Sequence, residues 1–447
     1  MPKLIIGNGF NEAMIGDTSK TGRAIHQTAA IEAKRLAWLI GKDDLLVLPS
    51  SLSQSMIHYI SKKSGEKITS ENFISIAENS TTASILTSRT LLEDELISRI
   101  QSKIIAPKLW EILPYFLTSS TLYLAQRLKI PTFKANTFSF LNQSGADLLN
   151  SKIVFRALAA EKIRVAPGFV CRNSRELYFA MHELLLTHSS LIIKQNMNAS
   201  GDGNIAVTLE NRLHYPGVRE IFRLTHPNDV TQEFVEKIWL QLYDSFGNHQ
   251  LVIEAFLKNT NTIYAEYEIH SNSDFDLLNY GIVRMDQSGD KRGNGMINWV
   301  GFQIPFSISQ SLAHSFFSQC DELVKMVSIL GYRGRINMDA IITDTHEVVL
   351  TEINGRLGGC THVHHVAQQL LGPQYLETHF ILTRNRFRIQ DLQQTFQSAE
   401  ALCNPSESRG VIILNEDQSG LGIIEYFVYA KSLDQALSIE QTFLQGG

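Results

Sequence analysis

The stretches VVLTEINGR, residues 348–356, and RINMDAII, residues 335–342, are the most informative parts of the chain. Both have the length and apolar alternation of β-strands, and together they are typical of a hairpin. Glu352 and Asn354 are two residues apart and therefore point to the same face of their strand. In a hairpin, Asp339 of the other strand can face them. Carboxylate and amide oxygens suit magnesium, so we expect Asp339, Glu352 and Asn354 to be metal ligands. The alternative is a strand edge that faces solvent.

An arginine flanked by glycines follows at once. Arg356 stands after Gly355 and before Gly358 and Gly359. Glycines let a guanidinium and nearby backbone N–H groups approach an anion closely. We therefore expect Arg356 to contact an anionic group of a ligand.

Two lysines are candidates for binding phosphate. Lys194 ends an apolar run and is followed by the polar loop 198–204, which contains Gly201 and Gly203. The N–H groups of such a loop can cover phosphates, although no P-loop motif is present. The alternative is a lysine at a strand end with its ammonium in solvent. Lys152, taken alone, reads as a surface lysine, and only its pairing with Lys194 favours a role in binding.

Other charged residues allow more than one interpretation. Glu254 is an isolated carboxylate in the apolar run 251–257. It indicates either an exposed strand face or a hinge whose backbone binds an adenine edge. Arg284 is a candidate for binding a substrate carboxylate, and a surface salt bridge is the alternative.

Two further motifs, one of three histidines after Arg356 and one at the N-terminus, are less specific indicators of function. His362, His364 and His365 could bind a transition metal, reach a substrate or phosphate, or cap the following helix. Residues 7–12, GNGFNE, are similar to a dinucleotide fingerprint, but Glu12 stands where the third glycine is needed. We expect a turn between a strand and a loop there, close to a substrate.

Composition bounds the class of protein. A chain of 447 residues is long enough for two or three domains. It is 44% apolar and 19% charged, with a net charge of −5, which predicts ordinary globular cores. Lysines and arginines form no long run, so a general nucleic-acid binder is not expected. The four scattered cysteines predict reduced thiols and a cytoplasmic protein. No apolar stretch reaches the roughly 20 residues of a membrane span, so we expect no membrane partner.

The order of segments predicts an α/β and α+β protein. Alternating strand-like and helix-like segments in the first part, such as the expected helix 24–40, indicate a parallel α/β layer. The middle reads as an α+β core, with an expected helix at 310–330. The end contains an expected strand pair and a final helix. We expect domains at residues 1–138, 139–385 and 386–447.

Taken together, these motifs resemble the ATP-grasp superfamily over about residues 140–385. The resemblance rests on NSK at 150–152, IIK at 192–194, VIE at 252–254, NMD at 337–339 and EINGR at 352–356. The N-terminal GNGFNE and the small C-terminal domain are similar to pheganomycin-type peptide ligases within that superfamily.

The resemblance implies a fold in which an N-terminal pre-grasp domain precedes two α+β subdomains that clamp ATP. It implies that Lys152 and Lys194, with the Gly201 and Gly203 loop, bind phosphates. Glu254, Ala255 and Leu257 would bind adenine or ribose. Asp339, Glu352 and Asn354 would hold Mg2+, and Arg356 would steady the transferred phosphoryl group, with Arg284 as a further candidate at the substrate.

The implied activity is an ATP-dependent ligase that joins a carboxylate to an amine through an acyl phosphate. The narrower resemblance implies amino-acid or peptide substrates, and a homodimer is compatible with it. Three alternatives remain open at this stage: carboxylate–thiol ligation, phosphorylation of a small molecule, and a nucleotide-binding regulatory protein without activity.

Overall fold

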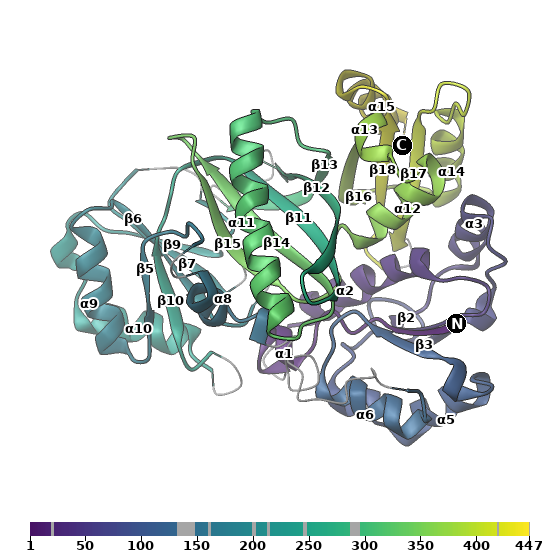
Figure 1. Ribbon diagram of the computed structural model, residues 1–447, viewed down its shortest axis with the longest axis horizontal. Helices are drawn as coiled ribbons and strands as arrows, with labels where there is room; N and C mark the ends of the chain where they lie inside the picture. Colours follow the sequence, from purple (N-terminus) through teal and green to yellow (C-terminus); the bar gives the residue numbers. More distant parts are fainter. Residues whose placement is uncertain are drawn as a thin grey trace.

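The computed structural model of the chain describes residues 1–18, 22–131, 148–159, 162–198, 203–211, 215–244, 248–286, 296–417 and 420–446. Three sheets organise these residues. In Figure 1 a small five-stranded unit lies at one end, the large sheet lies in the middle, and the N-terminal and C-terminal parts lie together at the other end.

The N-terminal part is the predicted parallel α/β layer. Its four strands are parallel and run in the order β3-β2-β1-β4. β2 is buried along its whole length, as expected of a strand covered on both faces. The helix expected over 24–40 is α2 followed by a tighter 3₁₀ segment, η2. The elements are β1 (Lys3–Ile6), α1 (Glu12–Ile15), α2 (Arg23–Ala33), η2 (Lys34–Leu39), β2 (Leu45–Ser50), α3 (Gln54–Ser64), η3 (Ser70–Asn72), β3 (Phe73–Ala77), α4 (Ser88–Leu91), α5 (Asp94–Lys103), η4 (Pro107–Leu109), β4 (Glu111–Pro114) and α6 (Ser119–Leu128).

The five-stranded unit has the strand order β5-β10-β6-β7-β9. Helices α9 and α10 pack on one face through a single apolar cluster that includes Leu177, Ile193 and Ile238. The elements from this part of the chain are α8 (Lys152–Ala159), β5 (Gly168–Cys171), α9 (Ser174–Leu185), β6 (Ser190–Gln195), β7 (Asn204–Thr208), β8 (Tyr215–Pro216), β9 (Glu220–Arg223), η5 (Pro227–Asp229), α10 (Gln232–Leu242) and β10 (Leu251–Ala255).

The large sheet has the order β15-β14-β11-β12-β13-β16-β18-β17, with β8 paired to β13. Helix α11 covers one face with Phe316, Cys320 and Leu323, which recur at helical spacing and are fully buried. The predicted hairpin of β14 and β15 is confirmed. The elements are β11 (Asn259–Ser271), β12 (Asp274–Asp286), β13 (Met296–Ile304), α11 (Gln310–Ile329), β14 (Gly334–Thr343), β15 (Val348–Asn354), α12 (Thr361–Leu371), α13 (Tyr375–Thr378), β16 (Phe380–Arg388), α14 (Leu392–Ala401), β17 (Gly410–Asp417), β18 (Ile423–Ala430) and α15 (Leu433–Gly446).

The C-terminal strands continue this sheet. β16 pairs with β13 on one side and with β18 on the other. The domain limit expected at 385/386 therefore falls inside β16, while the limit expected at 138/139 lies outside the described residues. The predicted strand pair and final helix correspond to β17, β18 and α15.

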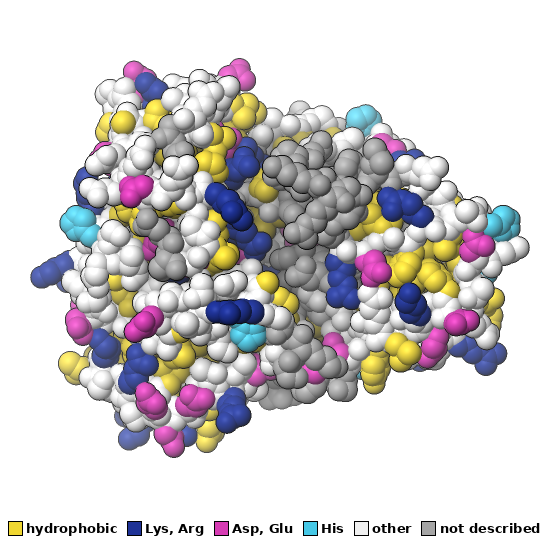
Figure 2. Space-filling view, turned by 180° about the vertical axis from the view of Figure 1, so that it is seen from behind, with side chains coloured by type: hydrophobic (Ala, Val, Ile, Leu, Met, Phe, Trp, Pro, Cys, Tyr) yellow, Lys and Arg dark blue, Asp and Glu magenta, His cyan; other side chains and the backbone are white. Residues whose placement is uncertain are grey.

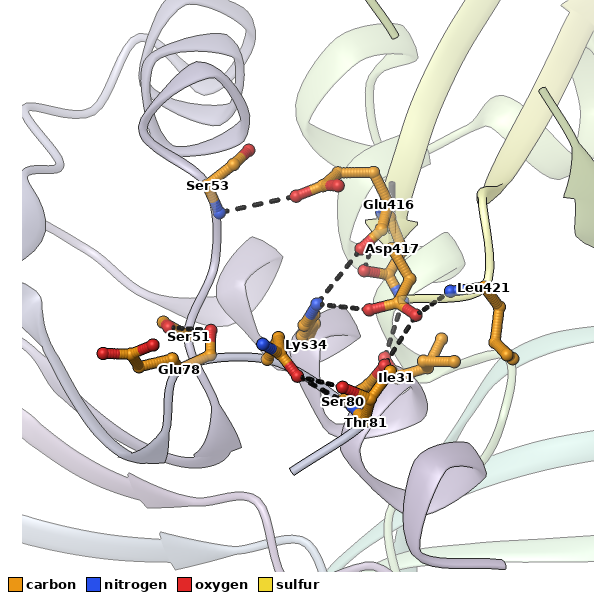
Figure 3. A network of polar contacts seen from close by, with 12 residues as sticks. Ile31, Lys34, Ser51, Ser53, Glu78, Ser80, Thr81, Glu416, Asp417 and Leu421 are labelled. Carbon is orange, nitrogen blue, oxygen red and sulfur yellow. Dashed lines mark hydrogen bonds and ion pairs between the residues drawn. The ribbon is translucent and has the colours of Figure 1, made fainter. Parts of the chain in front are cut away.

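A buried polar network joins the N-terminal layer to the C-terminal strands (Figure 3). The Lys34 ammonium of η2 lies 3.1 Å from Asp417 Oδ1, and the two side chains are 2% and 0% exposed. The other oxygen, Asp417 Oδ2, accepts hydrogen bonds from Ser80 Oγ at 2.7 Å and from the Leu421 N–H at 2.9 Å. The two parts are therefore held together by a charge pair that solvent does not screen.

Replacing Lys34 by methionine leaves Asp417 buried without its cation. We expect the free energy of unfolding to fall by about 3–5 kcal/mol, the usual cost of removing one partner of a buried pair. Urea unfolding measures this change, with the exposed Lys42→Met as the matched control. A Lys34→Met/Asp417→Asn double variant should recover part of the loss. Equal stability of Lys34→Met and the wild type would show that the pair does not stabilise the junction.

Candidate functional site

The predicted metal ligands come together on the β14–β15 hairpin. Asp339 and Glu352 are directly paired residues, and Asn337 pairs with Asn354. The Asn354 amide nitrogen donates to Asp339 Oδ2 and to Glu352 Oε1, each at 3.3 Å. Its oxygen accepts from Arg356, so the amide must turn by half a rotation before Oδ1 can bind a cation. Two carboxylates and an amide side by side are hard oxygen donors, which fit magnesium.

The two carboxyl groups differ in pKa. Burial raises the pKa of Asp339 to about 8, and the charge of Glu352 beside it acts in the same direction. For Glu352 burial also favours the neutral form, but Lys152 and Lys194 outweigh it and hold its pKa below the usual value. A further cation beside the pair would therefore favour the form in which both carboxylates are charged.

Lys152 begins α8 at the edge of the hairpin. Its ammonium lies 3.5 Å from Glu352 Oε2 and donates to Asn198 O at 3.1 Å. The residue is only 7% exposed, so the surface-lysine interpretation is wrong. The pKa of Lys152 is below its usual value, because burial desolvates the ammonium and Lys194 lies nearby, although Glu352 acts in the opposite direction.

Lys194 and Glu254 lie on the adjacent strands β6 and β10. The Lys194 ammonium is 2.5 Å from Glu254 Oε2, and Arg156 Nη1 donates to Glu254 Oε1 at 2.6 Å. All three side chains are largely buried, so neither Lys194 nor Glu254 is the solvent-facing residue of the alternative interpretations. Arg156 is not among the residues predicted from the sequence, although it follows Lys152 by one helical turn and therefore shares its face.

The expected phosphate loop and hinge border this pair. Gly201 lies outside the described residues. At Gly203 a Cβ atom would lie 2.3 Å from Gln195 Oε1, so a larger residue there requires the Gln195 and Asn198 side chains to move. On the hinge, the Ala255 N–H donates to Pro167 O at 2.8 Å, and the half-buried Leu257 follows two residues later.

Arg356 extends from the end of β15 towards two other parts of the chain. Its Nη2 donates to Asn354 Oδ1 at 3.0 Å, and its Nε donates to Asn150 Oδ1 at 3.1 Å. Its Nη1 is 3.5 Å from the hydroxyl of Tyr115, which comes from the N-terminal layer. Nothing in the sequence around Asn150 or Tyr115 indicates these contacts.

Arg284 does not join this cluster. Its guanidinium donates to both oxygens of Glu440 on α15, at 2.8 and 2.7 Å, and to Thr383 O. This geometry corresponds to the salt-bridge alternative, although the pair is partly buried rather than at the surface.

The three histidines lie on α12. His362 and His364 are buried, and desolvation lowers the pKa of each. His364 Nδ1 is 3.0 Å from the Tyr375 hydroxyl. Within the described ranges no group of three or more His, Cys, Asp or Glu side chains is arranged to hold a metal, so the transition-metal alternative is not supported.

The surface of the molecule carries charges of both signs. On the face drawn in Figure 2, Lys and Arg side chains are mixed with Asp and Glu towards the edges, and several Lys and Arg side chains lie beside the residues drawn in grey at the centre. Among the described helices none combines the length and apolarity needed to span a bilayer. All four cysteines are free thiols.

Comparison with known proteins identifies the class of fold. Residues 33–130 match the family model of the pre-ATP-grasp domain. Biotin carboxylase from Campylobacter jejuni, solved with β-γ-ATP, has a TM-score of 0.59 at 12% identity, covering 99% of this chain and 91% of that one. The biotin carboxylase domain of Hydrogenobacter thermophilus 2-oxoglutarate carboxylase, solved with MgADP and bicarbonate, has a TM-score of 0.56 at 11% identity, with coverage of 99% and 89%.

A third similar structure is N5-carboxyaminoimidazole synthetase from Staphylococcus aureus, with a TM-score of 0.54 at 12% identity and coverage of 100% and 97%. No curated protein matches the sequence of the chain. The described residues therefore have the ATP-grasp fold, residues 33–130 are similar to the pre-ATP-grasp domain, and the expected fold class is confirmed. The narrower resemblance to pheganomycin-type peptide ligases stays a prediction.

Proposed function

We propose that the chain is an ATP-dependent ligase that joins a carboxylate to an amine. The observation that carries the proposal is the carboxylate pair Asp339–Glu352, which faces the buried Lys152 ammonium at 3.5 Å. Lys152 is buried, while Asp339 and Glu352 are partly buried and open to a ligand on one side. A charge cluster of both signs with this much burial is costly unless a ligand uses it. A nucleoside triphosphate with a divalent cation supplies both charges that such a cluster accepts: an anion for the lysine and a cation for the carboxylates.

Each residue of the cluster has a role in this proposal. Lys152 and Lys194 bind the phosphates, and Glu352 and Glu254 hold their ammonium groups in place until ATP enters. The hinge from Ala255 to Leu257 holds the adenine edge. Asp339, Glu352 and Asn354 would hold Mg2+, which would supply charge neutralisation on the phosphates.

The chemistry proceeds in two steps. An oxygen of the substrate carboxylate attacks the γ-phosphorus of ATP, the bond to ADP breaks, and an acyl phosphate forms. Arg356 stabilises the charge on the transferred phosphoryl group, because preorganised donors in a site shielded from water are effective at this task. The amine then attacks the carbonyl carbon, phosphate leaves, and the nitrogen loses a proton to give the amide.

The similar structures support part of this proposal. Two of them were solved with a form of ATP or with MgADP, which supports nucleotide and magnesium binding. Because carboxylases are among them, formation of a carbon–nitrogen bond to an amino acid or peptide rests on sequence resemblance. The expected cytoplasmic location rests on the four scattered cysteines. The mass of the product separates amide formation from thioester formation, carboxylation and phosphorylation.

The test is ADP release by the purified full-length chain with ATP and magnesium, against pools of amino acids and peptides. We expect release that depends on one pool and a product lighter than the summed substrates by one water. ATP hydrolysis or binding that no carboxylate and amine mixture changes would contradict the proposal and favour a regulatory nucleotide-binding protein.

A further inference from the structure

The N-terminal turn at residues 7–9 has no role in the function proposed above, yet it is tightly built. Asn8 is 1% exposed, and its side-chain amide makes two hydrogen bonds with one residue. Its Nδ2 donates to Phe116 O at 2.8 Å, and its Oδ1 accepts from the Phe116 N–H at 3.2 Å. This double contact fixes both the position and the orientation of the chain just after β4.

The residue before Phe116 is held as well. The Tyr115 N–H donates to Ile6 O at 2.9 Å. The aromatic ring of Tyr115 lies against Gly9, where a Cβ atom would come within 3.2 Å of two ring carbons. The backbone at Tyr115 is therefore held by Ile6 directly and by Asn8 through the next residue, Phe116, and Gly9 leaves room for the Tyr115 ring.

Tyr115 in turn contacts the segment that carries Arg356. Its carbonyl oxygen accepts from the Leu357 N–H at 3.2 Å, and its hydroxyl is 3.5 Å from Arg356 Nη1. The Arg356 guanidinium carbon lies 5.9 Å from the centre of the Tyr115 ring, within the distance at which a cation and an aromatic ring attract each other. Tyr115 thus contacts Arg356 on the side that faces the N-terminal layer.

We propose that Tyr115 is a positioning residue, fixed by the turn at residues 7–9, that holds Arg356 in the orientation needed to contact the γ-phosphoryl group. This inference rests on the proposed function, because it assumes that Arg356 binds that group. It assigns to the N-terminal layer a part in phosphoryl transfer that acts through Arg356 and not through contact with ATP.

The test compares the dissociation constants of MgADP and of magnesium AMPPNP, a non-hydrolysable ATP analogue, by calorimetry on the full-length chain. The dissociation constant of MgADP divided by that of magnesium AMPPNP reports how well the site recognises the γ-phosphoryl group. A lower ratio means a weaker preference for AMPPNP. We expect Tyr115→Ala to reduce the preference for AMPPNP by roughly 3- to 30-fold, the range of a cation–ring contact, and to leave MgADP affinity unchanged. Tyr115→Phe, which keeps the ring, should have a smaller effect in the same direction.

Two further variants separate positioning from a general loss of structure. In an Arg356→Ala background, Tyr115→Ala should have no additional effect on the ratio, because coupled residues are not additive. Asn8→Asp keeps the size of the side chain but removes the donor to Phe116 O, and should lower the ratio as Tyr115→Ala does. Tyr123→Ala, a half-exposed tyrosine on α6, is the matched control.

These measurements have outcomes that overturn the positioning role of Tyr115. An unchanged ratio in Tyr115→Ala, with a changed ratio in Arg356→Ala, overturns the positioning role and leaves the proposed function intact. An additional loss from Tyr115→Ala in the Arg356→Ala background, or a loss of MgADP affinity with the ratio unchanged, also overturns it. Absence of MgADP binding to the wild type, or an unchanged ratio in Arg356→Ala, overturns the inference together with the role of Arg356 in the proposed function.

Discussion

In the Glu352→Gln variant the rate of substrate-dependent ADP release should fall by more than roughly 100-fold. A loss of up to that size is usual when a residue that only orients a metal ligand is removed, without loss of the ligand itself. Glu352 is paired with Asp339 and faces Lys152, so one substitution removes a metal ligand and the anion that holds a phosphate-binding ammonium. Glutamine keeps the size of the side chain. The loss should therefore be in activity and not in the midpoint of thermal unfolding.

Glu347→Gln is the matched control for this variant. Glu347 lies next to the same hairpin, and its half-exposed side chain pairs with Arg164 at the surface. We expect this control to keep full activity, since exposed pairs contribute little to stability. Turnover by Glu352→Gln within a few-fold of the wild type would rule out the metal-binding role of the Asp339–Glu352 pair.

Replacing Arg356 by alanine should reduce the rate of ADP release by about 10²- to 10³-fold, the usual effect of removing one preorganised donor from a developing charge. The affinity for MgADP should stay within about twofold of the wild-type value, because ADP lacks the group that Arg356 contacts. Arg356→Lys should not restore the rate, since an ammonium cannot reproduce the contacts that the guanidinium makes with Asn354 and Asn150 at the same time.

Single-turnover kinetics separates the rate of phosphoryl transfer from nucleotide binding in this experiment. Arg164→Ala, at an exposed arginine, serves as the control. A variant with weakened MgADP binding and an unchanged rate of phosphoryl transfer would show that Arg356 binds nucleotide and does not act on the transferred group.

The parts of the site that lie on one strand or one hairpin could be predicted from the sequence. Strand alternation places Glu352 and Asn354 on one face, and a short connection forces β14 and β15 to pair, so Asp339 faces them. The roles of the two lysines are harder to predict from the sequence. Lys152 and Lys194 are on separate elements, and only the resemblance to a known family indicated that they meet.

Contacts between distant segments could not be predicted. Arg284 and Glu440 are 156 residues apart, and Arg356 and Tyr115 are 241 apart, so no local pattern connects them. The same holds for the C-terminal strands, which read as a separate domain but extend the central sheet through β16. Pairing of remote strands depends on register and packing, which the pattern of one strand does not encode.

Activation of the carboxylate by ATP can be tested by following an oxygen atom from the carboxylate substrate into the released phosphate. The carboxylate substrate found in the pool screen is prepared with both carboxylate oxygens as oxygen-18, and the released phosphate is analysed by mass spectrometry. We expect one labelled oxygen in each phosphate, because the acyl phosphate breaks between the carbonyl carbon and the oxygen that attacked ATP. Unlabelled phosphate alongside a normal yield of amide would contradict activation of the carboxylate by phosphoryl transfer.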